Sequence, residues 1–146
     1  MWHIAVPTTI RETFIMMQLS PRFTLQIDTV TCGAMAALLL VLAGPLGGRL
    51  DLPADLLRWV GVGLLPWTAL LAWFATRAHV TRDTMQFVVG VNVAWVVASI
   101  GLLVSGQVGP NAWGVWFVVV QAVAVAVLAG VQAKVLPTTP RQQPAM

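Results

Sequence analysis

The sequence predicts an all-α protein, a four-transmembrane-helix bundle. Of its 146 residues, 58% are hydrophobic and only 9% are charged, whereas soluble domains carry about a quarter charged residues. The apolar residues gather in four runs, each close to the ~20 residues that cross a ~30 Å hydrocarbon core. The runs are continuous, as in membrane helices, and do not alternate as the strands of a barrel do.

The four runs cover approximately residues 27–46, 56–76, 85–104 and 112–133. Two segments rich in glycine and proline predict hairpin turns, at 44–53 between the first two spans and at 105–111 between the last two. The predicted division of the chain is a cytoplasmic N-terminal segment at 1–24, a transmembrane domain at 25–136 and a disordered, proline-rich tail at 137–146.

Basic residues predict how the bundle is oriented. With four spans, six of the eight lysines and arginines fall on the side of the two termini, and only Arg49 and Arg58 fall on the other. The positive-inside rule then places both termini in the cytoplasm. The net charge of +3 reflects this topology, so no nucleic-acid partner is expected.

The first residues leave two interpretations open. Ile10, Phe14 and Met17 recur at helical spacing, which favours a short interfacial helix on the cytoplasmic face. Alternatively, translation starts at Met16 or Met17 and the preceding residues are not part of the protein. A secretory signal is not expected, because Arg11 and Glu12 interrupt the segment.

Missing residue types exclude several kinds of chemistry. Cys32 is the only cysteine, so the chain forms no intramolecular disulfide, C-x-x-C pair or cysteine-based zinc site. The two histidines, His3 and His79, fall outside the spans and cannot hold a haem between two helices. We therefore expect no cofactor, no metal site and no enzymatic activity.

Several polar residues nevertheless fall inside or at the edge of the spans. The candidates for contacts between helices, or with a ligand, are Asp28, Thr31, Asn92, Ser99, Gln121 and Gln132. Asn92 and Ser99 are seven residues apart and share a helix face, as do Gln121 and Gln132. Thr31 and Asn92 are both expected roughly 8–10 Å from the cytoplasmic side at 1.5 Å per residue, and Gln132 near the same level.

These depths predict that Asn92 faces inward and hydrogen-bonds to the first or fourth helix. A structural role for Asn92, Ser99 and Gln121 is preferred over contact with a ligand or ion. An acid inside a membrane segment is a functional candidate by default. For Asp28 the preferred interpretation is a cap at the first turn of its helix, where a carboxylate suits the positive end of the macrodipole.

Two further patterns concern packing. Ala122, Ala126 and Gly130 form a row of small residues of the kind that lets another helix approach closely. Residues 30–44 are also similar to 91–106, and each segment is followed by a turn and a span that begins with tryptophan. This similarity predicts two parallel helical hairpin repeats.

The segments "LPADLLRWVGVGLLPWTALLAWFATR", "VNVAWVVASIGLLVSG" and "PNAWGVWFVVVQAVAVAVLAGVQ" together resemble a family of small, uncharacterised four-helix integral membrane proteins of bacteria. The likeness covers residues 22–136. It implies a location in the bacterial inner membrane and four spans, and it carries no catalytic or binding residue.

Three classes of function remain. The favoured one is a non-enzymatic accessory or structural subunit that binds partner helices, with the lipid bilayer and either a second copy or another membrane protein as partners. The alternative is a small oligomeric transporter or channel, because four helices with so few polar groups form a poor pathway alone. An enzyme, or a protein that binds lipid or quinone, is the third.

Overall fold

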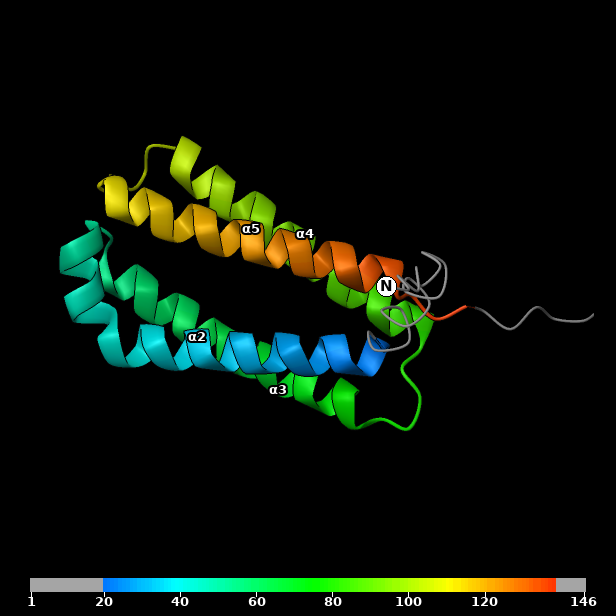
Figure 1. Ribbon diagram of the computed structural model, residues 1–146. Helices are drawn as coiled ribbons and strands as arrows, with labels where there is room; N and C mark the ends of the chain where they lie inside the picture. The colour runs from blue at the N-terminus through cyan, green and yellow to red at the C-terminus, as the bar shows by residue number, and fades with distance from the viewer. Residues whose placement is uncertain (1–19, 139–146) are drawn as a thin grey trace, which may run out of the picture.

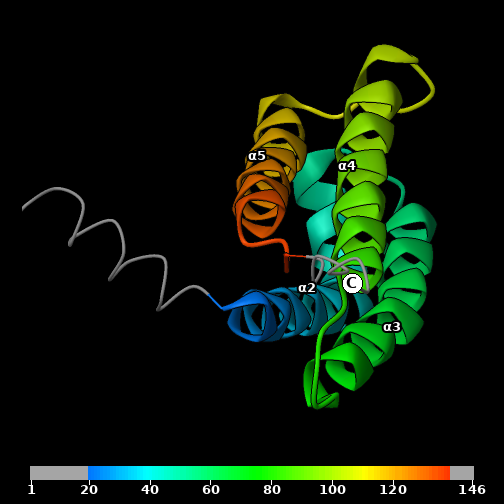
Figure 2. The ribbon, with the colours of Figure 1, turned by 90° about the vertical axis from the view of Figure 1, so that its right-hand side faces the viewer.

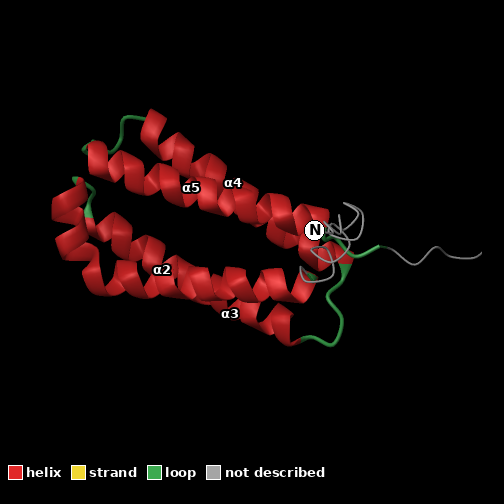
Figure 3. Cartoon of the chain, viewed as in Figure 1, coloured by secondary structure: helices red, strands yellow, loops and turns green. Residues whose placement is uncertain are grey.

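The computed structural model describes residues 20–138, which form four helices. In chain order these are α2 (Pro21–Leu50), α3 (Ala54–Thr76), α4 (Arg82–Val104) and α5 (Ala112–Lys134) (Figure 1). Each helix is long and apolar enough to cross a membrane, and residues 20–138 include no strand (Figure 3). The predicted all-α bundle of four apolar helices is confirmed. The expected interfacial helix and the two alternative start sites lie outside the described residues.

Polar caps fix where three of the helices begin. The side chains of Ser20, Thr81 and Asn111 accept hydrogen bonds from the backbone N–H groups three residues later, of Phe23, Thr84 and Gly114. Such a cap satisfies one of the four N–H groups that a helix leaves unpaired at its start. Because Ser20 is the cap of α2, this helix begins before the apolar run that predicts the first span.

The distal part of α2 departs from the predicted turn. The turn was expected at residues 44–53, but the helix continues through Gly44 and Pro45 to Leu50. Its backbone is non-helical at Leu42 (φ −109°, ψ 15°), so Pro45 falls in the first turn after a kink. A proline needs no hydrogen-bonding N–H there, which is why it does not end the helix. Only residues 51–53 form the turn.

The helices pair as two hairpins, α2 with α3 and α4 with α5, and α2 also packs against α5. Both hairpins start at the end where residues 20 and 138 lie and run in the same direction (Figure 1). We call this the terminal end, and the end with turns 51–53 and 105–111 the distal end. Between α3 and α4, the rings of Trp67 and Phe87 meet edge to face, with centroids 6.0 Å apart.

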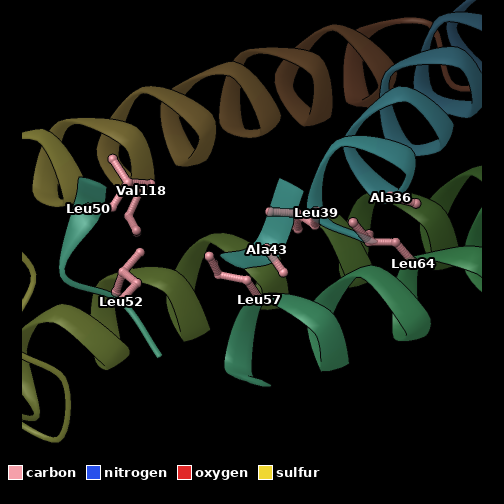
Figure 4. Close-up of a cluster of buried hydrophobic side chains, with 8 residues drawn as sticks. All are labelled: Ala36, Leu39, Ala43, Leu50, Leu52, Leu57, Leu64 and Val118. Carbon is pink, nitrogen blue, oxygen red and sulfur yellow. The ribbon is translucent and has the colours of Figure 1, made fainter. Parts of the chain in front are cut away.

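Two apolar clusters fill the interior. The distal cluster joins α2, α3 and α5, and its buried members are Ala36, Leu39, Ala43, Leu50, Leu52, Leu57, Leu64 and Val118 (Figure 4). The terminal cluster consists of Leu25, Leu71, Ala75, Met85 and Val88. Viewed from the terminal end, α2 lies between α3 and α5 (Figure 2). A polar site on α2, α4 and α5 lies beside the terminal cluster.

Candidate functional site

Three polar side chains from three helices meet inside the bundle, and we call them the Asp28 cluster. Asn92 Nδ2 donates a hydrogen bond to Asp28 Oδ2 over 2.9 Å and another to Gln132 Oε1 over 3.0 Å. Gln132 Nε2 donates to the same Asp28 Oδ2 over 2.8 Å. Because Asp28 is on α2, Asn92 on α4 and Gln132 on α5, the cluster joins the two hairpins.

The cluster is enclosed by protein. The exposed fractions are 3% for Asp28, 4% for Asn92 and 0% for Gln132, so none of the three faces the membrane lipid. A polar group buried in apolar surroundings is costly unless it is hydrogen-bonded. Each member supplies what its neighbour lacks, because the carboxylate accepts and the two amides donate.

Neighbouring residues of α2 extend this polar strip in both directions. One turn deeper, Cys32 Sγ donates to Asp28 Oδ1 over 3.4 Å. One turn toward the terminal end, the fully buried Thr24 donates its hydroxyl to the carbonyl of Pro21 over 2.8 Å. Thr24, Asp28 and Cys32 recur every four residues and therefore share one face of the helix.

The arginines at the terminal end bind carbonyl groups. Arg22 Nε donates to the carbonyl oxygen of Ala75 over 2.8 Å, and an Arg82 nitrogen to that of Pro137 over 3.4 Å. The ion pair found within residues 20–138 joins Asp55 and Arg58 on the surface of α3. The Asp28 carboxyl group thus accepts hydrogen bonds from neutral donors.

Three candidate residues lie outside the cluster. Thr31 was expected at the level of Asn92 but is exposed, and its hydroxyl donates to the carbonyls of Ile27 and Asp28 in its own helix. Ser99 is buried and donates to the carbonyl of Trp95, also in its own helix. Gln121 is half-buried, and the hydrogen bonds of the described residues include none to its amide.

The preferred interpretation of Asp28 as a helix cap is wrong. Helix α2 begins at Pro21 with Ser20 as its cap, so Asp28 lies two turns inside the helix. Its carboxylate bonds to α4 and α5 instead of to the first backbone N–H groups of α2. The apolar run gave no sign of this, because "PRFTLQ" at 21–26 extends the helix beyond the strongly hydrophobic stretch.

The residues of the small-residue row on α5 differ in burial. Ala122 is buried against the bundle, whereas Ala126 and Gly130 are exposed. A Cβ added at Gly130 would meet no atom of the described chain within 4 Å. The row is therefore not a contact among the four described helices, and its packing against a partner helix stays a prediction.

A second contact, which we call the distal contact, joins the hairpins at the other end. Asn111 Nδ2 donates to the carbonyl of Arg49 over 2.8 Å, and the backbone N–H of Asn111 donates to the carbonyl of Leu50 over 3.2 Å. A Cβ at Gly114 would collide with the carbonyl oxygen of Leu50 and lie 2.7 Å from Pro110 Cβ. Sequence reasoning missed Gly114, although a glycine three residues after a cap asparagine was the available signal.

The chemistry of the Asp28 cluster is that of a hydrogen-bonded carboxyl group. Residues 20–138 hold no group of three His, Cys, Asp or Glu side chains that could bind a metal ion. The carboxyl group and the thiol carry exchangeable protons, whereas the two amides only donate and accept hydrogen bonds. The arrangement also fixes the two hairpins relative to each other at a single depth.

No family model, curated protein or solved structure matches this chain. The resemblance to the four-helix family of bacteria accordingly stays a prediction. The four apolar helices and the enclosed polar cluster between them are the features of a small, multi-pass integral membrane protein.

Proposed function

We propose that this protein is a non-enzymatic accessory subunit of the bacterial inner membrane, with both termini in the cytoplasm, and that it acts by binding a helix of another membrane protein or of a second copy. The observation that carries this proposal is the open surface at Ala126 and Gly130. Both residues are exposed on α5, and small side chains allow the close backbone approach on which helix association in lipid depends.

The neighbouring residues suit such a contact. Val123 and Val127, with exposed fractions of 56% and 63%, lie beside the two small residues, on one side of the row. We propose that glycine and alanine form the floor of a shallow groove, with the valines on one side, that accepts the ridge of another helix. Because water plays no part inside the membrane, this close packing and not apolarity itself selects the partner.

The test is capture of partners with two matched variants. Ala126→Leu fills the proposed groove, and Ala124→Leu places the same side chain on an exposed position on the other side of α5. Each tagged protein is purified in mild detergent, and its co-purifying proteins and its own oligomeric state are measured. We expect Ala126→Leu to lose the partner or the oligomer and Ala124→Leu to keep it. Equal recovery from both variants would contradict the proposed surface.

Orientation is tested separately. Six of the eight basic residues belong to the segments on the side of the termini, which supports a cytoplasmic terminal end. Reporter fusions after Lys134 should be active in the cytoplasm, and fusions within 107–111 should be active outside it. A periplasmic signal from the C-terminal fusion would contradict this orientation.

The second candidate is a small oligomeric transporter, and the Asp28 cluster is the observation that favours it. Ionisable residues buried in membrane helices are typical of ion and proton pathways. Proteoliposomes that contain the protein should then show a flux that Asp28→Asn abolishes and Asp55→Asn, on the exposed surface of α3, leaves unchanged. Absence of flux for a panel of ions and small cations would remove this candidate.

A further inference from the structure

The two carboxyl oxygens of Asp28 have different surroundings. Oδ2 accepts two N–H groups, from Asn92 and Gln132, at 2.9 and 2.8 Å. Oδ1 is approached by the thiol of Cys32 alone, over 3.4 Å, and a thiol is a weak donor. One oxygen is therefore fully paired, and the other is not.

No cationic side chain of residues 20–138 pairs with this carboxyl group. Around it, α2 contributes Thr24 and Cys32, α4 contributes Asn92 and α5 contributes Gln132, while α3 adds apolar residues to the terminal cluster. The charged or titratable groups at this end are elsewhere: Arg22 and Arg82 on backbone carbonyls, Arg77 over the ring of Trp73, and His79, Asp83 and Lys134 exposed. An ionised carboxylate here would be a buried charge without a counter-ion, which is strongly unfavourable.

The size of the site limits what can neutralise it. Asp28 is 3% exposed and Gln132 is fully enclosed. A metal cation requires several oxygen ligands, whereas Oδ2 is surrounded by N–H groups and Oδ1 by sulfur. A proton requires one oxygen lone pair and no additional space.

We propose that Asp28 is a membrane-buried proton-binding site. A proton taken from water forms an O–H bond on Oδ1, and the carboxylate becomes a neutral carboxylic acid. Oδ2 remains the carbonyl oxygen that accepts from Asn92 and Gln132. The O–H group then donates to Cys32 Sγ, so the hydrogen bond between these two atoms reverses direction. This proton site is independent of the proposed partner surface on α5.

The site lies nearer the terminal end than the distal end. Asp28 follows the first residue of α2 by seven positions, a depth of about 10 Å at 1.5 Å per residue. On the distal side, the same helix continues with Ala36, Leu39 and Ala43, all buried in the distal cluster. The stretch of apolar packing is therefore longer toward the distal end than toward the terminal end.

Infrared spectroscopy of the full-length protein in lipid nanodiscs tests the site directly. A protonated carboxyl group has a carbonyl-stretching band well separated from the bands of a carboxylate. The spectrum of the protein at neutral pH should contain this band, and Asp28→Asn should remove it. The matched control is Asp55→Asn, because Asp55 is an exposed acid that pairs with Arg58, and this variant should retain the band. If Asp28→Asn removes carboxylate bands and leaves the protonated region unchanged, the proposal is overturned.

Thermal unfolding in the same nanodiscs provides a second readout. Asparagine has one carbonyl oxygen and one donor group, so it mimics the neutral acid but not the carboxylate. We expect Asp28→Asn to melt at the same temperature as the unmodified protein at neutral pH. A variant that fails to fold while the unmodified protein lacks the protonated band would refute the proton site.

Discussion

The two ends of the bundle are joined in different ways. At the terminal end, the side chains of Asp28, Asn92 and Gln132 hydrogen-bond across three helices. At the distal end, Asn111 and Gly114 bring the start of α5 against the backbone of Arg49 and Leu50. The terminal contact consists of hydrogen bonds between side chains, whereas the distal contact combines the Asn111 side chain with close backbone packing at Gly114, which has no side chain.

The two contacts are expected to contribute differently to the free energy of unfolding. Hydrogen bonds between membrane helices contribute on average only about 0.6 kcal/mol, because the separated helices also find partners for their polar groups. A closely packed contact is less adaptable, because any added side-chain atom must displace a neighbouring atom. The distal contact should therefore tolerate substitution less well than the terminal contact. The hydrogen bonds of the terminal contact can rearrange more easily than the close packing at Gly114.

The largest effect is expected at Gly114. Gly114→Leu places side-chain atoms where the carbonyl of Leu50 and Pro110 Cβ lie, and it should lower the free energy of unfolding by about 3 kcal/mol, the upper part of the range for overpacked sites. Gly63→Leu is the control, because a Cβ there meets nothing within 4 Å. Equal unfolding midpoints of the two variants in detergent would show that the distal contact does not hold the hairpins together.

At the other end, Asn92→Leu removes the two hydrogen bonds that Asn92 donates. The bond from Gln132 to Asp28 remains, and leucine is comfortable among apolar neighbours. We expect a loss of about 1–2 kcal/mol in the free energy of unfolding, measured against Val93→Leu on the exposed side of α4. A larger loss than that of Gly114→Leu would reverse the ranking of the two ends.

Substitutions of Asn111 distinguish its role as the cap of α5 from its role in the contact between the hairpins. Asn111→Ala loses both the bond from the N–H of Gly114 and the bond to the carbonyl of Arg49, at a cost of about 1 kcal/mol. Asn111→Asp keeps an acceptor for the helix start and loses the donor, so it should recover part of this stability. If Asn111→Asp is as unstable as Asn111→Ala, the bond to Arg49 is the dominant contribution.

The smallest effect is a gain. Asp51 ends α2 in the left-handed conformation, with φ 51°, which glycine adopts without the steric penalty of a Cβ. Asp51→Gly should raise the free energy of unfolding by about 0.5 kcal/mol, measured by chemical denaturation. Asp51→Ala, which has a Cβ and no polar group, should lower it instead.

Composition and the continuity of the apolar runs were sufficient to predict the four helices. They were not sufficient to locate the ends of α2, because hydropathy reports what lies in lipid and not where the helix begins. Ser20 is the cap, and the first residues of α2 are only partly apolar. Placing Asp28 at the helix start followed from this error.

The candidate polar residues differ in whether their side chains bond within their own helix or to another helix, and residue spacing does not predict this. The hydroxyls of Thr31 and Ser99 bond to carbonyls one turn earlier in their own helices, which serine and threonine can always do. The side chains of Asn92 and Gln132 and the carboxyl group of Asp28 found their partners on other helices. Residue type thus separated the hydroxyls from the amides, but it did not separate Gln132 from Gln121, which bonds to no other helix among the described residues. The depth and rotation of the helices decided between these two glutamines.

The kink at Leu42 also sets the membrane thickness that the protein fits. As a straight helix, the 30 residues of α2 would extend about 45 Å, whereas the 23 residues of each of the other helices extend about 35 Å. Bending after Leu42 turns the surplus residues away from the direction of the span. The protein can therefore match a hydrocarbon core of about 30 Å without tilting one helix against the others. In a thicker bilayer, either the lipid thins around the protein or this joint straightens and adds the distal residues of α2 to the span.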